Sequence, residues 1–257
     1  MVSENVQDAV VVPASDLYWQ GHWTNGPTAV EVLADHLQVP LTDYAVGGAK
    51  SGNGNAIHWM DLYEDTGVLG QIDKFKATLK NGQADSHALY FIFASANDFF
   101  EHEDSSLPGT LPDLADQAIA NMETAVSRLA EMGAKRFLVV NSTNLSIMPF
   151  AIAQGLADRA AEFQTRFNSE LPIRMDTLES RFGVEITLFD YIAISNKIRN
   201  NPAQFSLKNL TEPCQPVFFV VGSVCSSPDE YYFWDESHPT RRVHQIVGEA
   251  MAAIFGK

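Results

Sequence analysis

Short apolar segments alternate with amphipathic helical segments along most of this chain, which limits the folds that it can adopt. Ala88 to Ala94 is a continuous apolar run of strand length, Arg136 to Val140 and Val184 to Phe189 are further expected strands, and Asp43 to Val46 is expected to be a shorter strand. A run that is apolar throughout is typical of a strand buried on both faces, so Ala88 to Ala94 is expected at a central position. The pattern predicts a parallel sheet covered by helices.

Helical segments lie between and around these strands. Apolar residues at steps of three and four predict one buried helix face, and Gly133 is placed to end that helix. The stripe consists of Leu114, Ala118, Met122, Ala125, Leu129 and Met132. Further helices are expected over Ala29 to Leu37, over about Ala151 to Arg181, and over Pro239 to Phe255 with proline near the first turn. Right-handed crossovers then give a three-layer α/β/α sandwich, and the length suits a single domain over residues 1–257.

The charge of the chain excludes some classes of partner. Seventeen basic and thirty-two acidic residues give a formal net charge of −15. That field repels phosphate backbones, so nucleic acid is not an expected partner. The longest apolar runs, such as Val217 to Val221, fall short of the roughly 18 residues that cross a bilayer, so no integral membrane segment is expected. Met1 to Val12 carries acidic residues and no basic region, and it does not resemble a signal peptide.

Cys214 and Cys225 are the two cysteines of the chain, eleven residues apart. A disulfide, which would suit an oxidising compartment, and two reduced thiols both fit this spacing. Two thiols without a neighbouring histidine or acidic cluster do not form a zinc site. No metal or organic cofactor is expected.

Three segments at predicted strand ends or helix starts carry groups suited to proton transfer and to holding an oxyanion. Asp235 lies three residues before His238, where its carboxylate can accept a hydrogen bond from one imidazole nitrogen while the other takes a proton from a hydroxyl. Gly48, in a double-glycine turn, can point a backbone N–H outward. Asn97, directly after the most apolar strand, can add an amide donor. Glycine turns and Asn-Asp turns are also common structural features, so each segment alone is ambiguous.

Taken together, these residues resemble the SGNH (GDSL-type) esterase and lipase family. In that family a Ser, a Gly, an Asn and a His come from four blocks in this order, and an Asp three residues before the His completes a triad. Gly48, Asn97 and the Asp235/His238 pair match the last three blocks. Further segments resemble the family, and they are Tyr18-Trp19-Gln20-Gly21, Thr24-Asn25-Gly26-Pro27, Asn201-Pro202-Ala203-Gln204-Phe205 and Cys225-Ser226-Ser227-Pro228-Asp229-Glu230. The likeness runs from about Pro13 onward and is specific to the branch of bacterial lipases, phospholipases and hemolysin-like esterases.

The resemblance implies a flavodoxin-like fold and hydrolysis of carboxylic esters, with a small-molecule or lipid ester as substrate. It assigns His238 as general base, Asp235 as the residue that orients it, and Gly48 and Asn97 as oxyanion donors. With the disulfide that the spacing allows, it favours a secreted or periplasmic location. The alternative from another class is a catalytically inactive binding or scaffold protein on the same fold.

The sequence departs from the family at three places. Ser95 stands where the third block usually has glycine, and His22 stands where arginine is common. The third departure is severe, because Gly-Asp-Ser-Leu does not occur anywhere. In the family that block ends the first strand, which lies inside the sheet between the second and third strands, and its serine is the nucleophile.

Three explanations account for this missing block. The chain starts late, so that the strand and serine lie upstream; or Ala9 to Val12 replaces the strand and Ser15 replaces the nucleophile; or the protein is a folded, inactive relative. The first strand of the predicted sheet is accordingly missing or replaced. Ser15 is three residues beyond the apolar run and lacks a flanking glycine, and Ser142, at another strand end, belongs to a non-catalytic loop in the resemblance.

Overall fold

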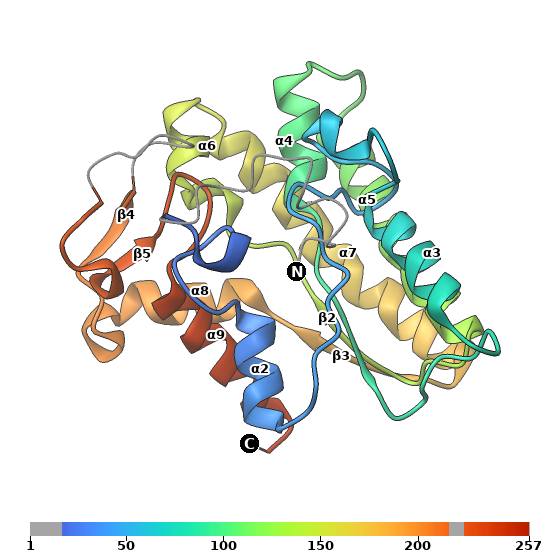
Figure 1. The fold of residues 1–257 in the computed structure, drawn as a ribbon. Helices are drawn as coiled ribbons and strands as arrows, with labels where there is room; N and C mark the ends of the chain where they lie inside the picture. The colour runs from blue at the N-terminus through green and yellow to red at the C-terminus, as the bar shows by residue number, and fades with distance from the viewer. Residues whose placement is uncertain (1–16, 216–223, 257) are drawn as a thin grey trace. The chain divides into compact units, whose positions relative to one another are not determined.

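The computed structural model describes residues 17–215 and 224–256 (Figure 1). The chain packs as two compact units. Unit 1 consists of Met1–Asp43, Ser146–Ala157 and Tyr191–Lys257, and unit 2 consists of Tyr44–Leu145 and Asp158–Asp190. Because the chain passes repeatedly between the units, we keep the prediction of one domain over residues 1–257 as a proposal.

Unit 2 is built on a parallel sheet. Its strands β1 (Leu89–Ile92), β2 (Arg136–Val140) and β3 (Glu185–Phe189) lie in the order β1-β2-β3, and their first residues are in register. Figure 1 labels β2 and β3. Four of the five residues of β2 are buried, since this strand has a neighbour on both sides. The apolar runs predict all three strands. Parallel strands that alternate with helices confirm the expected fold class, a parallel-sheet α/β protein of the α/β/α sandwich type.

The central position predicted for β1 is not found within the described residues. The sequence places this strand at the centre of the sheet, whereas β1 lies at an edge of the described sheet and β2 lies at its centre. An apolar composition indicates that both faces of a strand are covered by helices. It does not indicate which strands pair with it at its two edges.

The strand predicted over Asp43 to Val46 is also wrong, because these residues form no strand. A strand requires the hydrogen-bonded ladder of a neighbour, and among the described residues the sheet of unit 2 contains only β1, β2 and β3. The ring of Tyr44 instead contacts Phe75 edge-on, and its hydroxyl lies 3.3 Å from Thr78 Oγ1.

The helices of unit 2 are α3 (Val68–Thr78), α4 (Ala96–Asp104), α5 (Leu111–Glu131) and, from Asp158 on, α7 (Ala157–Phe182). The stripe predicted from periodicity is the buried face of α5, which includes Met122 and Leu129. Gly133 follows the last turn with a φ of +107°, as expected for the residue that ends the helix.

The helical region predicted over about Ala151 to Arg181 consists of two helices. α6 (Pro149–Ala153) ends just before Gly155, which has a φ of +69°, and α7 begins at Ala157. Leu156 N–H donates to Ala151 O at 2.7 Å and closes the end of α6. Glycine adopts this left-handed conformation without steric cost, so the chain can stop one helix and start the next.

In unit 1, α2 (Ala29–Leu37) packs beside α9 (Arg241–Ile254) (Figure 1). α2 has the predicted bounds, and a capping box of Thr28 and Glu31 fixes its start. Gly248 permits the close approach of the two helices, because a Cβ there would lie 2.6 Å from Ala29 O.

The closing helix starts slightly later than predicted. Its N-cap is Thr240, so Pro239 precedes the helix and does not lie in its first turn. The remaining elements of unit 1 include α8 (Tyr191–Asn200) and the parallel pair β4 (Asn209–Pro213) and β5 (Tyr231–Phe233). The short 3₁₀ turns of the chain are η1 (Trp19–Gly21), η2 (His58–Asp61), η3 (Leu145–Ile147), η4 (Pro202–Phe205) and η5 (Pro228–Glu230).

Some predictions fall on residues that the structure does not describe. These are the apolar run Val217 to Val221, the replacement strand Ala9 to Val12 and Ser15. Within residues 17–215 and 224–256, none of the helices has the length and apolar character needed to cross a membrane.

His244 links the packing of α2 and α9 to pH. Its Nδ1 lies 3.2 Å from Ala29 N and accepts a hydrogen bond from that N–H, so this nitrogen must be unprotonated. Burial, followed by the charges of His238 and His22, lowers the pKa of His244 to about 3. An unfolded histidine titrates near about 6.5. Below that pH the unfolded chain therefore binds more protons than the folded one, and the stability that the neutral ring contributes is lost as the pH falls toward about 3.

When the pH is lowered from about 7.5 to about 5, we expect the free energy of unfolding to fall in the parent chain more than in His244→Asn. The extra loss in the parent chain should be on the order of 1–2 kcal/mol. Asparagine can place an acceptor near the position of Nδ1 and does not titrate. Urea unfolding of both proteins at the two pH values measures the difference. The same pH dependence in both would show that His244 does not carry this effect.

Candidate active site

The segment from Asp235 to His238 is a closed turn between β5 and α9. Trp234 N–H donates to His238 O at 2.7 Å, and Phe233 and Pro239 form an antiparallel bridge across the base of the turn. These two contacts hold both ends of the turn, so the short loop has a defined conformation.

Asp235 and His238 form the hydrogen-bonded pair that their spacing predicts. His238 Nδ1 lies 2.9 Å from both Oδ1 and Oδ2 of Asp235. Asp235 is fully buried, whereas 35% of the His238 side chain is exposed. Because Nδ1 faces the carboxylate, Nε2 is the ring nitrogen suited to exchanging a proton with a hydroxyl.

Asp235 is held as a carboxylate in spite of its burial. Its Oδ1 also accepts hydrogen bonds from the N–H groups of Ser237 and His238, at 2.9 and 2.7 Å. Burial alone would raise the pKa of Asp235, but the charge of His238 and the hydrogen bonds from His238 and Ser237 outweigh it and bring the pKa below its usual value. An ionised Asp235 can stabilise an imidazolium at His238.

Two aromatic residues contact the pair, and the sequence did not predict these contacts. Tyr18 Oη donates to Asp235 Oδ2 at 2.9 Å, and both residues are fully buried. Trp23 stacks on the His238 ring, with centroids 5.3 Å apart and planes inclined by 23°. Tyr18 belongs to a segment that resembles the family, but no sequence signal indicates its contact with a carboxylate 217 residues away.

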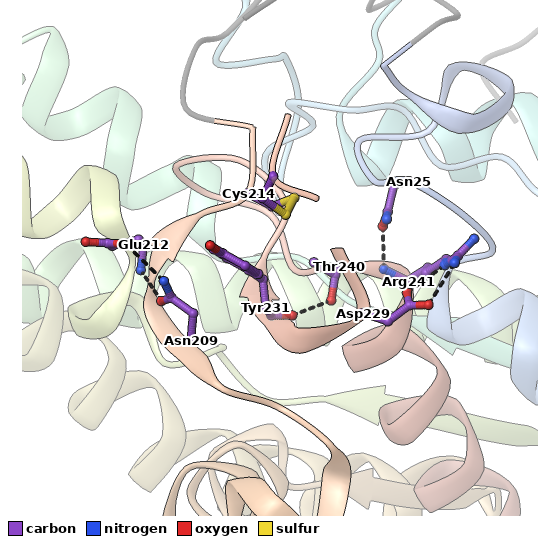
Figure 2. The surroundings of a disulfide bond; sticks show 9 residues. Asn25, Asn209, Glu212, Cys214, Asp229, Tyr231, Thr240 and Arg241 are labelled. Carbon is purple, nitrogen blue, oxygen red and sulfur yellow. Dashed lines mark hydrogen bonds and ion pairs between the residues drawn. A yellow bond between two sulfur atoms is a disulfide. The ribbon is translucent and has the colours of Figure 1, made fainter. Parts of the chain in front are cut away.

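A disulfide joins Cys214 and Cys225, with Cα atoms 4.9 Å apart (Figure 2). The structure thus decides between the two states that the spacing left open. Cys214 N–H donates to Phe233 O at 3.0 Å, and Cys214 packs in a buried cluster with Tyr18 and Trp234. The disulfide therefore lies against the residues that lead into Asp235.

The start of α9, just after the turn, is fixed by polar contacts (Figure 2). Asn25 Oδ1 accepts a hydrogen bond from Arg241 N–H at 2.7 Å, and Thr240 Oγ1 donates to Tyr231 O at 2.8 Å. The Arg241 guanidinium binds both carboxylate oxygens of Asp229, at 2.8 and 2.7 Å. These contacts limit how far the turn can move.

In unit 2, the backbone at Gly48 has the geometry that an oxyanion donor requires. Gly48 has a φ of +81°, and a Cβ there would collide with Asn55 Oδ1. Asn55 Nδ2 donates to Gly47 O, and Ala56 N–H donates to Gly48 O, both at 2.9 Å. Among the described residues, Gly48 N–H donates no hydrogen bond, so it can serve an acceptor from a ligand.

Asn97 lies in the first turn of α4, beside the Gly48 turn. Its Nδ2 donates to Ala49 O at 3.0 Å. An amide carries two N–H hydrogens, so this contact leaves a second one for another acceptor. Ser95, which stands where the family usually has glycine, has a φ of −174°. This is extended backbone that any residue can adopt, so serine is tolerated there.

A buried carboxylate next to Asn97 also holds the loop that follows Gly48, and the sequence did not predict it. Asp98 accepts hydrogen bonds from Ser51 N–H at 2.9 Å and Ser51 Oγ at 2.7 Å. Asn121 Nδ2 donates to Ser51 Oγ at 3.0 Å. Burial raises the pKa of Asp98, and the bonds from Ser51 oppose that rise. Asn97 and Asp98 together fix the glycine turn to α4.

We expect Gly48→Ala to lower the free energy of unfolding by on the order of 2–4 kcal/mol, because alanine disfavours the left-handed backbone and its Cβ meets Asn55. Gly82→Ala is a matched control, since Gly82 has a φ of +67° and no atom within 4 Å of an added Cβ. Its loss is expected to be only about 1–2 kcal/mol, from the backbone alone. Equal losses in urea unfolding of the two variants would contradict the close approach at Gly48.

Of the two serine candidates, Ser15 and Ser142, the structure describes only Ser142. Ser15 lies outside the described residues. Ser142, just after β2, is fully buried, and its backbone N–H and C=O are both bound by the Asn168 side chain at 2.8 and 3.2 Å. An enclosed serine of this kind is not placed to attack a substrate. Within residues 17–215 and 224–256, no group of three or more His, Cys, Asp or Glu side chains is arranged to hold a metal ion.

The structure therefore brings the predicted residues together in two pairs. Asp235 contacts His238 in unit 1, and the Gly48 turn contacts Asn97 in unit 2. The first pair can accept and return a proton, and the second can donate two hydrogen bonds to an oxyanion.

Most of the chain is similar to a known protein family and to known proteins. The family of GDSL-like lipases/acylhydrolases matches residues 14–251. The thermolabile hemolysin of Vibrio parahaemolyticus serotype O3:K6 is 26% identical over 266 residues, which cover 93% of this chain and 57% of the hemolysin. GDSL esterase/lipase At5g41890 of Arabidopsis thaliana is 24% identical over 285 residues, which cover 90% of this chain and 77% of that protein.

Among solved structures, Est24, a carbohydrate acetylesterase from Sinorhizobium meliloti, aligns with 89% of this chain and 84% of its own, at a TM-score of 0.48 and 14% identity. The match to the hemolysin spans only 57% of the length of that protein. The family match covers nearly all of the chain. The chain therefore belongs to the GDSL-like lipase/acylhydrolase family, a family of ester hydrolases.

Proposed function

We propose that the protein is a serine-type hydrolase of carboxylic esters in which Asp235 and His238 form the acid–base pair. The observation that carries this proposal is the contact of His238 Nδ1 with the buried Asp235 carboxylate at 2.9 Å. A buried carboxylate that accepts from Nδ1 orients the ring and stabilises its protonated form. This is the arrangement that a general base for a serine requires.

In the proposed reaction a serine hydroxyl attacks the ester carbonyl, and its proton passes to His238 Nε2. The tetrahedral intermediate then breaks the C–O bond to the alcohol, and His238 delivers the proton to that leaving group. A water molecule attacks the acyl-enzyme in the same way, and the serine recovers its proton from His238. Asp235 stays ionised throughout.

Gly48 N–H and the second Asn97 amide hydrogen are the proposed donors to the oxyanion of each tetrahedral intermediate. Their support is the positive φ and the unused N–H of Gly48 within the described residues, and the contact of Asn97 with Ala49 O. Removal of one such donor in other enzymes costs about 3 kcal/mol in the transition state.

The identity of the nucleophile is the finer part of the proposal, because Gly-Asp-Ser-Leu is absent from the sequence. The serine either lies upstream of residue 1 or is Ser15. The relatives are named as esterases, lipases and a hemolysin, which favours a small-molecule or lipid ester as substrate. The same absence favours one alternative function, a catalytically inactive protein that binds esters or serves as a scaffold.

Hydrolysis of a short-chain aryl ester by three proteins tests these proposals. The proteins are the 257-residue chain, its Ser15→Ala variant, and a longer version that includes upstream in-frame coding sequence. Activity that Ser15→Ala abolishes supports Ser15, and activity that only the longer protein shows supports an upstream serine. Activity that survives Ser15→Ala supports a hydrolase with another nucleophile. No activity in any protein that is folded by circular dichroism overturns the hydrolase and supports the binding protein.

A further inference from the structure

Tyr18 is a buried tyrosine whose hydroxyl the proposed reaction does not use. Its Oη lies 2.9 Å from Asp235 Oδ2. Its ring meets Trp23 and Trp234 edge-on, with centroids 5.6 and 6.3 Å away. Trp23 also stacks on His238. Tyr18 therefore contacts both the Asp235 carboxylate, which binds the His238 imidazole, and the Trp23 indole, which covers that imidazole.

The donors to Asp235 divide between its two oxygens. Oδ1 accepts the backbone N–H groups of Ser237 and His238. In the described part of the chain, the only donors to Oδ2 are Tyr18 Oη and His238 Nδ1. Tyr18 therefore donates a hydrogen bond to Oδ2, the oxygen that receives none from the backbone. This bond fixes the plane in which the carboxylate meets the imidazole.

We propose that Tyr18 is a positioning residue of the acid–base pair, whose hydroxyl fixes the Asp235 carboxylate, withdraws part of its negative charge, and so sets the proton affinity of His238. The inference rests on the proposed function, in which His238 is the general base. Hydrogen bonds to an ionised acceptor are roughly twice as strong as neutral ones. In a buried chain of groups, such bonds also polarise one another.

The hydroxyl stays a donor over the whole working range of pH. Burial, followed by the charge of Asp235 and its hydrogen bond, raises the pKa of Tyr18 well above its usual value. Among the described residues, the other titratable groups that act on this site are Glu236, beside Asp235, and the histidines His22 and His244. Replacing Tyr18 by phenylalanine leaves all of them in place, so a change in His238 titration reports the hydroxyl.

The test is an NMR titration of the His238 imidazole in the parent chain, in Tyr18→Phe and in Tyr232→Phe. Without the tyrosine hydroxyl, Oδ2 carries more negative charge toward Nδ1 and stabilises the imidazolium. We expect the midpoint of the His238 titration to rise by on the order of 0.5 pH unit, a fraction of the shift that a full opposite charge produces. Tyr232 Oη donates to Ser195 Oγ at 3.0 Å in a buried site of the same unit, so Tyr232→Phe removes a comparable bond and should leave the midpoint unchanged.

A second replacement keeps the test decisive if the phenylalanine variant does not fold. 3-Fluorotyrosine at position 18 has a more acidic hydroxyl, which is a stronger donor, and it should shift the midpoint downward. A midpoint that stays unchanged in both Tyr18 replacements, or that moves opposite to these directions, overturns the proposal. The proposal is also overturned if Tyr232→Phe shifts the midpoint as much as Tyr18→Phe does.

The kinetic effect separates this inference from the proposed function. In the active protein, Tyr18→Phe should lower kcat by on the order of tenfold with little change in KM, since the hydroxyl contacts the acid–base pair and not the substrate. Ester hydrolysis with an unshifted His238 and unchanged kcat in Tyr18→Phe refutes only the role of Tyr18. A shifted His238 in a protein that hydrolyses no ester supports the role of Tyr18 on the pair and refutes hydrolysis.

Discussion

His238→Ala is expected to lower kcat for a short-chain aryl ester by at least about a thousandfold in the protein that the hydrolysis assay identifies as active. His238 takes the serine proton when the acyl-enzyme forms and takes the water proton when it breaks down, so both steps lose their base. Asp235 cannot replace it, because its carboxylate is fully buried. The residual rate comes from the oxyanion donors and from substrate binding.

His87→Ala is the control for this change. The His87 side chain is 94% exposed, and we expect the variant to keep the parent rate. Circular dichroism and urea unfolding establish that both variants are folded. If His238→Ala is folded and stays within about tenfold of the parent rate, His238 is not the general base.

Asn97→Ala is expected to lower kcat by about 10²–10³-fold with a much smaller change in KM, because an oxyanion donor acts on the charge that develops in the transition state. The change also removes the hydrogen bond to Ala49 O, so part of the effect can come from a displaced Gly48 turn. Asn97→Asp loses the hydrogen bond to Ala49 O as well, because a carboxylate has no N–H to donate. Aspartate has nearly the same shape as asparagine, but it places a negative charge where the oxyanion forms, so its kcat should fall at least as far.

Asn81→Ala, at an exposed position in the same unit, is the matched control and should leave kcat unchanged. Parent-like rates in both Asn97 variants would show that this amide does not hold the oxyanion. A fall in kcat for Asn97→Ala but not for Asn97→Asp would assign the effect to packing and contradict the donor role.

Apolar periodicity predicted the elements whose packing depends on a regular pattern. The bounds of α2 and the buried face of α5 follow from apolar steps of three and four. β2 and β3 follow from strand-length segments that are rich in apolar residues. The pattern could not place the helix break at Gly155. Glycine can adopt a left-handed conformation, but it can also adopt a helical one, so its presence alone does not predict where a helix ends.

β4 and β5 could not be predicted in this way. Asn209–Pro213 contains mostly polar residues and no alternation, and its ladder partner Tyr231–Phe233 is a separate segment further along the chain. Strand formation in such a segment depends on the partner and on the surrounding fold more than on local preference. The same limit applies to the position of β1 at an edge of the described sheet, since pairing is a property of two strands.

Contacts within the candidate site were predictable where few residues separate the partners or where strand ends meet. Asp235 and His238 lie three residues apart, so one turn brings them into contact. Gly48 and Asn97 are far apart in sequence, but each was placed at the carboxyl end of a predicted strand, the edge at which such sheets carry their sites. Asn97 does contact the Gly48 turn, although the strand expected before Gly48 is absent.

Contacts between distant buried groups had no sequence signal. Tyr18 reaches Asp235 across 217 residues, and Asp98 reaches Ser51 across 47. The disulfide was open for the same reason, because two cysteines bond only if the fold brings their Cα atoms to roughly 4.4–6.8 Å, and spacing does not give that distance. These contacts support the chemical groups that the sequence did predict.

The most direct test of the account is to locate the serine that a fluorophosphonate modifies, by peptide mass spectrometry, in the active protein and in its His238→Ala variant. A fluorophosphonate modifies serines that a neighbouring base has activated. We expect one modified serine in the parent protein and almost no modification in His238→Ala. A folded parent protein with no modified serine, or equal modification in both proteins, would contradict the claim that Asp235 and His238 activate a serine for ester hydrolysis.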